Sequence, residues 1–145
     1  MKKYAVAMLV VLSIVLAGCG SNSQSGTING NWSANLTNSN GSQIFSFSTS
    51  VAEMSGGTLS FSNFSFSTNS SCFTSGNTES GTFGLAGNFN GNVNGTFGMT
   101  VQSVNPSGNL LTLNGTVNGN TITGTWTLTG SSGCSGSGNF TMTKM

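Results

Sequence analysis

Apolar residues alternate with serine, threonine, asparagine and glycine along most of the chain after residue 27. Trp32, Ala34 and Leu36 lie on one side of such an alternation, as do Phe97, Met99 and Val101 further on. A period of two residues is typical of half-buried β-strands. No segment shows the three-to-four-residue spacing of an amphipathic helix, and the abundant Ser, Thr, Asn and Gly are poor helix formers. The pattern therefore predicts an all-β domain.

About eight strands are predicted from these apolar positions. Their apolar residues are Trp32, Ala34 and Leu36; Phe45, Phe47 and Val51; Leu59, Phe61, Phe64 and Phe66; Phe83, Leu85 and Phe89; Phe97, Met99 and Val101; Leu111, Leu113 and Val117; Ile122, Trp126 and Leu128; and Phe140 and Met142. The alternation changes phase within residues 59–66, and a bulge near Ser62 or Asn63 would turn all four apolar residues there toward the core. The connections are too short for parallel crossovers, so we expect antiparallel pairing of consecutive strands.

Turn signals lie between the predicted strands. Asn90-Gly91 and Asn118-Gly119 are the clearest, because Asn-Gly accepts the positive φ angles of a type I′ hairpin turn. Asn40-Gly41, Gly56-Gly57 and Pro106-Ser107-Gly108 mark further connections.

The predicted architecture is an antiparallel up-and-down β-barrel, with a β-sandwich as the alternative. Natural sheets protect exposed edge strands with lysine, proline or bulges. Here Lys144 lies at the far end of the last strand and Pro106 lies in a turn, so the strands carry little edge protection. Closure removes the edges, and we therefore expect the strand at Trp32 to pair with the strand at Phe140 and Met142.

The first 19 residues form a separate unit. Lys2 and Lys3 precede an apolar run from Tyr4 to Leu16, which is interrupted only by Ser13 and ends in Ala17-Gly18-Cys19. A transmembrane helix needs about 20 apolar residues, so a cleaved signal is favoured over an uncleaved membrane anchor.

Leu16-Ala17-Gly18-Cys19 resembles the lipobox of bacterial lipoproteins. In that family the chain is cut before the cysteine, which receives a diacylglyceryl thioether and usually an N-acyl chain such as palmitate. The resemblance implies a signal peptide over residues 1–18, lipidation of Cys19 and attachment to a membrane of the cell envelope. Gly20 replaces the aspartate that favours inner-membrane retention in the family, which implies the outer membrane. We expect residues 19–26 to be a flexible tether and residues 27–145 to form the barrel.

Few residues are available for chemistry. The whole sequence contains no histidine and only two acidic side chains, Glu53 and Glu79, both in predicted loops. A serine-hydrolase triad is excluded, because no histidine could activate a serine. Nucleic-acid binding is disfavoured, because Lys144 is the only basic side chain left after signal cleavage. We therefore expect no enzyme, metal or cofactor.

Cys72 and Cys134 remain once Cys19 is assigned to lipid. An even pair in an exported protein predicts a disulfide, although two free thiols are the alternative. The bond would close a loop of 62 residues (134 − 72) and stabilise the fold by roughly 4 kcal/mol on a chain-entropy estimate.

Gly30-Asn31-Trp32 on the first strand resembles the lipocalin and avidin superfamily of eight-stranded barrels. There the tryptophan closes one end of the barrel. Lipocalins place an arginine against it, and this chain has none; avidins hold biotin partly with tyrosine and aspartate, and beyond the signal this chain has neither. Trp32 and Trp126 are candidates either for ligand contacts or for plugging a barrel end.

Thr121, Thr123, Thr125, Thr127 and Thr129 alternate with the apolar residues of one predicted strand. Such a threonine ladder could order water or dock a sugar, but solvent-facing threonines with good β propensity explain it equally well. One strand alone makes no flat array.

Two functional classes follow from these features. The first is a lipid-tethered binding module whose barrel takes a small apolar ligand or a glycan. The second is a structural or interaction protein of the envelope with a solid core. The volume left among Phe45, Phe61, Phe83, Phe97 and Trp126 distinguishes them, because small barrels can be either filled or hollow. The sequence leaves the oligomeric state open.

Overall fold

The computed structural model describes residues 28–73, 76–77, 83–104 and 107–145, which are almost entirely β-strand. In chain order the strands are β1 (Gly30–Asn38), β2 (Gln43–Glu53), β3 (Thr58–Thr68), β4 (Gly76–Asn77), β5 (Phe83–Gly91), β6 (Gly95–Val104), β7 (Ser107–Asn118), β8 (Thr121–Thr129) and β9 (Gly136–Lys144). A short 3-10 turn, η1 (Ser55–Gly57), joins β2 to β3. The predicted signal peptide and tether, residues 1–26, lie outside the described residues.

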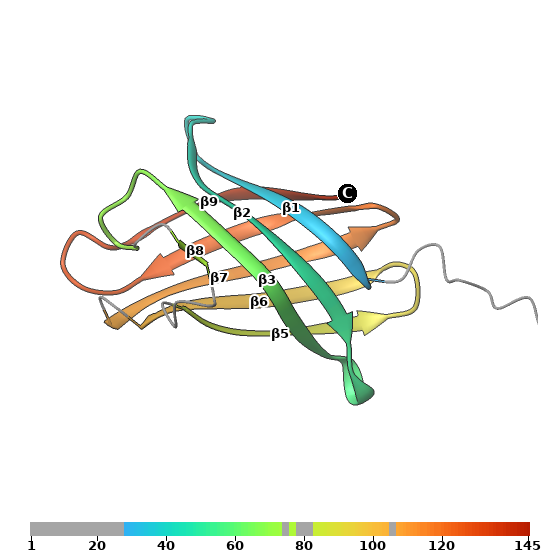
Figure 1. Cartoon of the computed structure of the whole chain (residues 1–145). Coiled ribbons are helices and arrows are strands. Elements are labelled where there is room, and N and C mark those ends of the chain that lie inside the picture. Colours follow the sequence, from blue (N-terminus) through green and yellow to red (C-terminus); the bar gives the residue numbers. More distant parts are fainter. Residues whose placement is uncertain (1–27, 74–75, 78–82, 105–106) are drawn as a thin grey trace, which may run out of the picture.

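All strand pairings are antiparallel, and the sheet closes on itself (Figure 1). Eight strands run around the barrel in the order β1-β2-β3-β5-β6-β7-β8-β9, and β9 returns to β1 with Trp32 opposite Lys144 and Asn38 opposite Gly138. The two-residue β4 pairs with β3 only, at Ser65 and Phe66. The predicted barrel and the pairing of its first and last strands are confirmed, and the sandwich alternative is wrong. The architecture is compatible with a lipocalin-like barrel.

Strands β3 and β5 share fewer paired residues than any other neighbouring strands around the described barrel. The join between them consists of the pairs Thr58–Asn88 and Leu59–Gly87. Beyond these pairs Phe61 lies over Gly87, where an added Cβ would come within 2.6 Å of the ring atom Cζ. Side-chain packing therefore continues this join where the backbone ladder stops.

A bulge in β3 confirms the phase change predicted near Ser62 and Asn63. Ser48 pairs with Ser65 while Ser50 pairs with Ser62, so the β2–β3 register shifts at this point. Asn63 has a φ of 51°, a left-handed conformation that asparagine tolerates better than most residues. As a result Leu59, Phe64 and Phe66 are buried, and Phe61 packs against the core in a half-buried position.

Both predicted type I′ turns are wrong in detail. Strand β5 continues through Gly91, which pairs with Gly95, so that hairpin has a three-residue loop. In the β7–β8 hairpin Asn118 pairs with Thr121, and the loop is Gly119-Asn120. The positive φ is confined to Gly119, at 60°. Glycine at the first central position is the requirement of a type II′ turn, so the Asn-Gly pair marks the hairpin but is placed one residue early.

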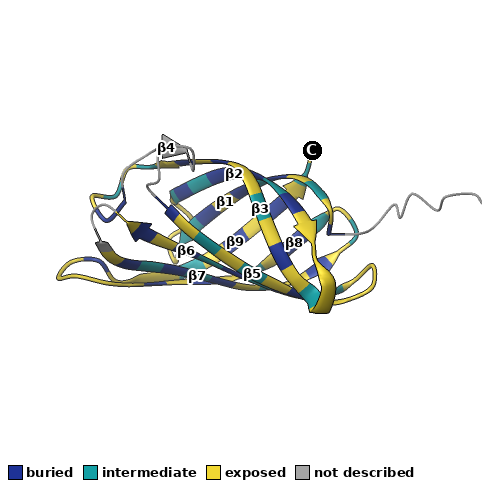
Figure 2. Ribbon diagram, turned by 60° about the horizontal axis from the view of Figure 1, so that its bottom comes forward, coloured by how far each residue is buried: buried dark blue, intermediate teal, exposed yellow. Residues whose placement is uncertain are grey.

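Buried residues alternate with exposed ones along the strands (Figure 2). On some strands the inward face also carries glycines, which lie beside the largest rings. Phe140 pairs with Gly124 on β8 and reaches Gly115 on β7, where an added Cβ would lie 2.7 Å from the ring. Trp126 similarly lies beside Gly136 and Gly138 of β9. These glycines leave room for rings that span neighbouring strands.

We predict that Gly138→Ala destabilises the protein, while Gly136→Ala is close to neutral. A Cβ at Gly138 would overlap the carbonyl oxygen of Thr37 and approach Nε1 of Trp126 to 2.8 Å, whereas at Gly136 the nearest atoms of Trp126 are 3.6 Å away. Overpacking of this kind costs about 1–3 kcal/mol. Chemical denaturation measures the difference, and equal stability of the two variants would contradict the packing described here.

Candidate functional site

The interior of the barrel is filled by aromatic rings. Phe45, Phe47, Phe64, Phe66, Phe73 and Phe83 form one cluster. Neighbouring ring centroids in it lie 5.2 to 6.4 Å apart, the range of favourable aromatic pairs. Trp126 meets Phe45 edge-on at 5.4 Å, and Phe97 meets Phe140 at 6.3 Å. The residues expected either to line a ligand cavity or to fill it therefore pack against other aromatic rings or, for Phe61, against Gly87.

Hollows on the described surface open outward. One of about 330 Å³ lies on the outer face of β5, β6 and β7 around Gly98. Another of about 300 Å³ is lined by the serines of β1, β2 and β3. A third lies among the turns that include Gly57 and Asn90. These hollows thus lie on the outer face of the barrel and among its turns.

Trp32 anchors the end of the barrel at which the described chain begins and ends, which we call the tether end. Its side chain is fully buried, and Nε1 donates a hydrogen bond of 2.8 Å to the Ile28 carbonyl oxygen. The Lys144 ammonium group lies 5.6 Å from the ring centroid, within the range of a cation–π contact. A basic side chain of the last strand therefore lies against Trp32, a contact that was not identified from the sequence.

Trp126 lies toward the opposite end. Its ring crosses Gly138 of β9. Nε1 donates a hydrogen bond of 2.9 Å to the carbonyl oxygen of Thr37 on β1, two strands away. The β1–β2 register is irregular between Leu36 and Thr37. The side chain thus fixes three strands to one another from inside the barrel.

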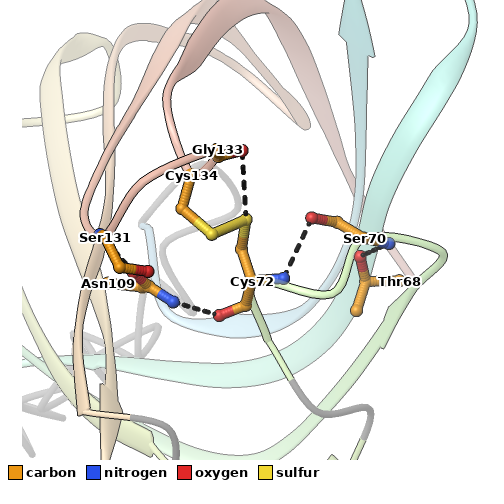
Figure 3. The surroundings of a disulfide bond; sticks show 7 residues. All are labelled: Thr68, Ser70, Cys72, Asn109, Ser131, Gly133 and Cys134. Atoms are coloured by element: carbon orange, nitrogen blue, oxygen red, sulfur yellow. Dashed lines mark hydrogen bonds between the residues drawn. A yellow bond between two sulfur atoms is a disulfide. The ribbon is translucent and has the colours of Figure 1, made fainter.

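The end of the barrel opposite the tether end is closed by the predicted Cys72–Cys134 disulfide (Figure 3). It joins the loop after β3 to the loop between β8 and β9, and both sulfur-bearing residues are buried. Phe73 follows Cys72 and packs on Phe45, Phe66 and Phe83. The loop is therefore a plug as well as a crosslink, and the disulfide prediction is confirmed.

Asn109 of β7 supports this plug and was not identified from the sequence. Its side chain is 1% exposed. Nδ2 donates a hydrogen bond of 2.6 Å to the Cys72 carbonyl oxygen, and Oδ1 accepts one of 3.1 Å from the Ser131 backbone N–H. The same side chain thus ties β7 to both loops that the disulfide joins (Figure 3).

The remaining predicted residues that the structure describes do not form a site. Cys19 and Glu79 lie outside the described residues. Glu53, expected in a loop, is instead the last residue of β2. Its backbone N–H donates a hydrogen bond of 2.6 Å to Oδ1 of Asn29. Within the described ranges no three potential metal ligands come together. Helices of the length and apolarity needed to cross a bilayer are absent from the same ranges.

Comparisons with protein-family models, with curated proteins and with solved structures gave no match.

We predict that Asn109→Ala lowers the free energy of unfolding by about 1–3 kcal/mol, because it leaves a buried carbonyl oxygen and a backbone N–H without their partner. Asn114→Ala on the same strand is the control, since its side chain is exposed. Denaturation with the disulfide intact measures both variants. A loss no larger than that of the control would show that the plug does not depend on Asn109.

Proposed function

We propose that the chain is a lipid-anchored protein of the cell envelope whose barrel acts through its outer surface. The observation that carries this proposal is the interior packing of aromatic rings described above. It favours an interaction protein with a solid core over a carrier of a small apolar ligand. The proposal assigns no catalysis to the barrel, because the sequence lacks histidine, arginine and aspartate.

Membrane attachment in this proposal rests on the lipobox resemblance of Leu16-Ala17-Gly18-Cys19. Several acyl chains on Cys19 would hold the protein firmly, since each buried methylene contributes about 0.8 kcal/mol and one chain alone is marginal. Gly20 favours the outer membrane.

The ends of the barrel would then have different surroundings. Eight residues separate Cys19 from Ile28, and the nine steps from one to the other span at most about 30 Å when fully extended. The described chain enters the barrel on β1 and leaves it on β9 (Figure 1). Trp32 pairs with Lys144 at this end, so the tether end would face the bilayer. The end closed by the disulfide would point away from it, and the flanks between would be open to other envelope components.

We predict that Cys19→Ala moves the protein from the membrane fraction to the soluble fraction of its host without changing its thermal stability. The substitution removes the acceptor of the acyl chains and lies outside the barrel. Fractionation followed by immunodetection, with mass spectrometry of the mature N-terminus, measures both the location and the lipid.

Ser21→Ala, two residues further along the tether, is the matched control and should remain with the membrane. A Cys19→Ala protein that has lost its signal peptide and still stays firmly membrane-bound would contradict the proposed anchor.

A further inference from the structure

The outer face of β6, β7, β8 and β9 carries polar side chains in rows that cross all four strands. The cross-strand register aligns three such rows. In strand order they are Thr96, Thr116, Thr123 and Thr141; Gly98, Asn114, Thr125 and Asn139; and Thr100, Thr112, Thr127 and Ser137. The threonine ladder of β8 therefore does not stand alone but is the third column of a two-dimensional array.

The array has a regular spacing and a uniform chemistry. Neighbouring strands lie about 4.8 Å apart, and alternate residues along a strand about 6.8 Å apart. Eight of its twelve positions are threonine, and none is charged or has a large apolar side chain. We call these twelve positions the hydroxyl face.

Most side chains of the hydroxyl face make no hydrogen bond to other described residues. Within the described residues, the one internal hydrogen bond from a side chain of this face is that of the Thr100 hydroxyl, which lies 3.4 Å from the Ala86 carbonyl oxygen. Threonine is also stiff about χ1, so little conformational entropy is lost when its hydroxyl binds a ligand.

A hollow in the face lies around Gly98. It has a volume of about 330 Å³, and its lining combines the polar Asn88, Asn114 and Thr112 with the apolar Ala86. A Cβ built on Gly98 would overlap Oδ1 of Asn88 and lie 3.9 Å from Oδ1 of Asn114. The absent side chain leaves two amide groups directed at the same small space, where they could both accept and donate hydrogen bonds.

The hydroxyl face has neutral polar side chains, which limits the classes of partner that it can bind. A nucleic acid or an acidic polymer would require basic groups, and a lipid or an apolar protein surface would require exposed apolar groups; the face has neither. Adjacent strands also twist by about 20–25°, or roughly 70° across four strands. A flat crystalline surface cannot follow that twist, whereas a flexible chain of hydroxylated rings can.

We propose that the hydroxyl face binds a neutral glycan chain, with one sugar ring seated in the hollow at Gly98. This inference rests on the proposed function, because it names the partner of the outer surface. Hydroxyl and amide groups of the glycan exchange hydrogen bonds with the threonine rows and with Asn88 and Asn114.

The test removes one row of hydroxyls and keeps the side-chain shape. The variant is Thr116→Val/Thr123→Val/Thr141→Val, and the full lipidated chain in neutral detergent is titrated with chitohexaose, cellohexaose and dextran by NMR. We expect saturable binding of at least one of them. The variant should weaken it by about tenfold or more, because each hydrogen bond contributes about two- to tenfold in affinity.

The matched control is Ser33→Ala/Ser48→Ala/Ser65→Ala, which removes three aligned hydroxyls from β1, β2 and β3. It should change the affinity by less than about twofold. Thr125→Glu, at a single exposed position, serves as a second variant should the triple valine chain not fold, and it too should weaken binding. Binding of none of the three glycans, an equal loss in the serine control, or affinity for polygalacturonate alone would overturn the inference. The titration needs no membrane, so its failure leaves the Cys19 anchor standing.

Discussion

A closed barrel of eight strands encloses a space that its own side chains must fill or leave to a ligand. In this chain the filling depends on glycines that face inward beside the largest rings. Phe61 lies over Gly87, Phe140 reaches across Gly124 to Gly115, and Trp126 crosses Gly138. Each ring thereby reaches a strand that it does not belong to, and packing connects strands whose backbone pairing is short, as it is between β3 and β5.

The scarcity of charged side chains affects both the ends of the barrel and its outer surface. With almost no charged side chains to protect an open edge, closure of β9 onto β1 leaves no edge at that join. The tether end is fixed by Trp32 and Lys144, and the opposite end by the Cys72–Cys134 plug that Asn109 supports. Because the interior is occupied by side chains, the neutral hydroxyls and amides outside are the groups left for recognition, which is the basis of the proposed function.

Alternation of apolar and polar residues was enough to predict the eight strands and the bulge at Asn63, because both depend on which side chains must face inward. The antiparallel order followed from the short connections, and closure followed from the lack of charged or proline-protected edges. The turn types could not be predicted in the same way. Gly119 could be the first or the second central residue of its turn until the β7–β8 register was known. The lysine over Trp32 and the buried Asn109 depend on contacts between residues distant in sequence, which no local pattern records. The threonine ladder was visible, but its extension over four strands required the cross-strand register.

Binding of xenon followed by NMR tests the filled interior most directly, because xenon enters apolar cavities that water leaves empty. The wild-type barrel should show no saturable shift among its core side chains. Phe64→Ala, which removes a fully buried ring from the aromatic cluster, should acquire one saturable site. Saturable xenon binding inside the wild-type barrel would contradict the account and return the carrier of a small apolar ligand to first place.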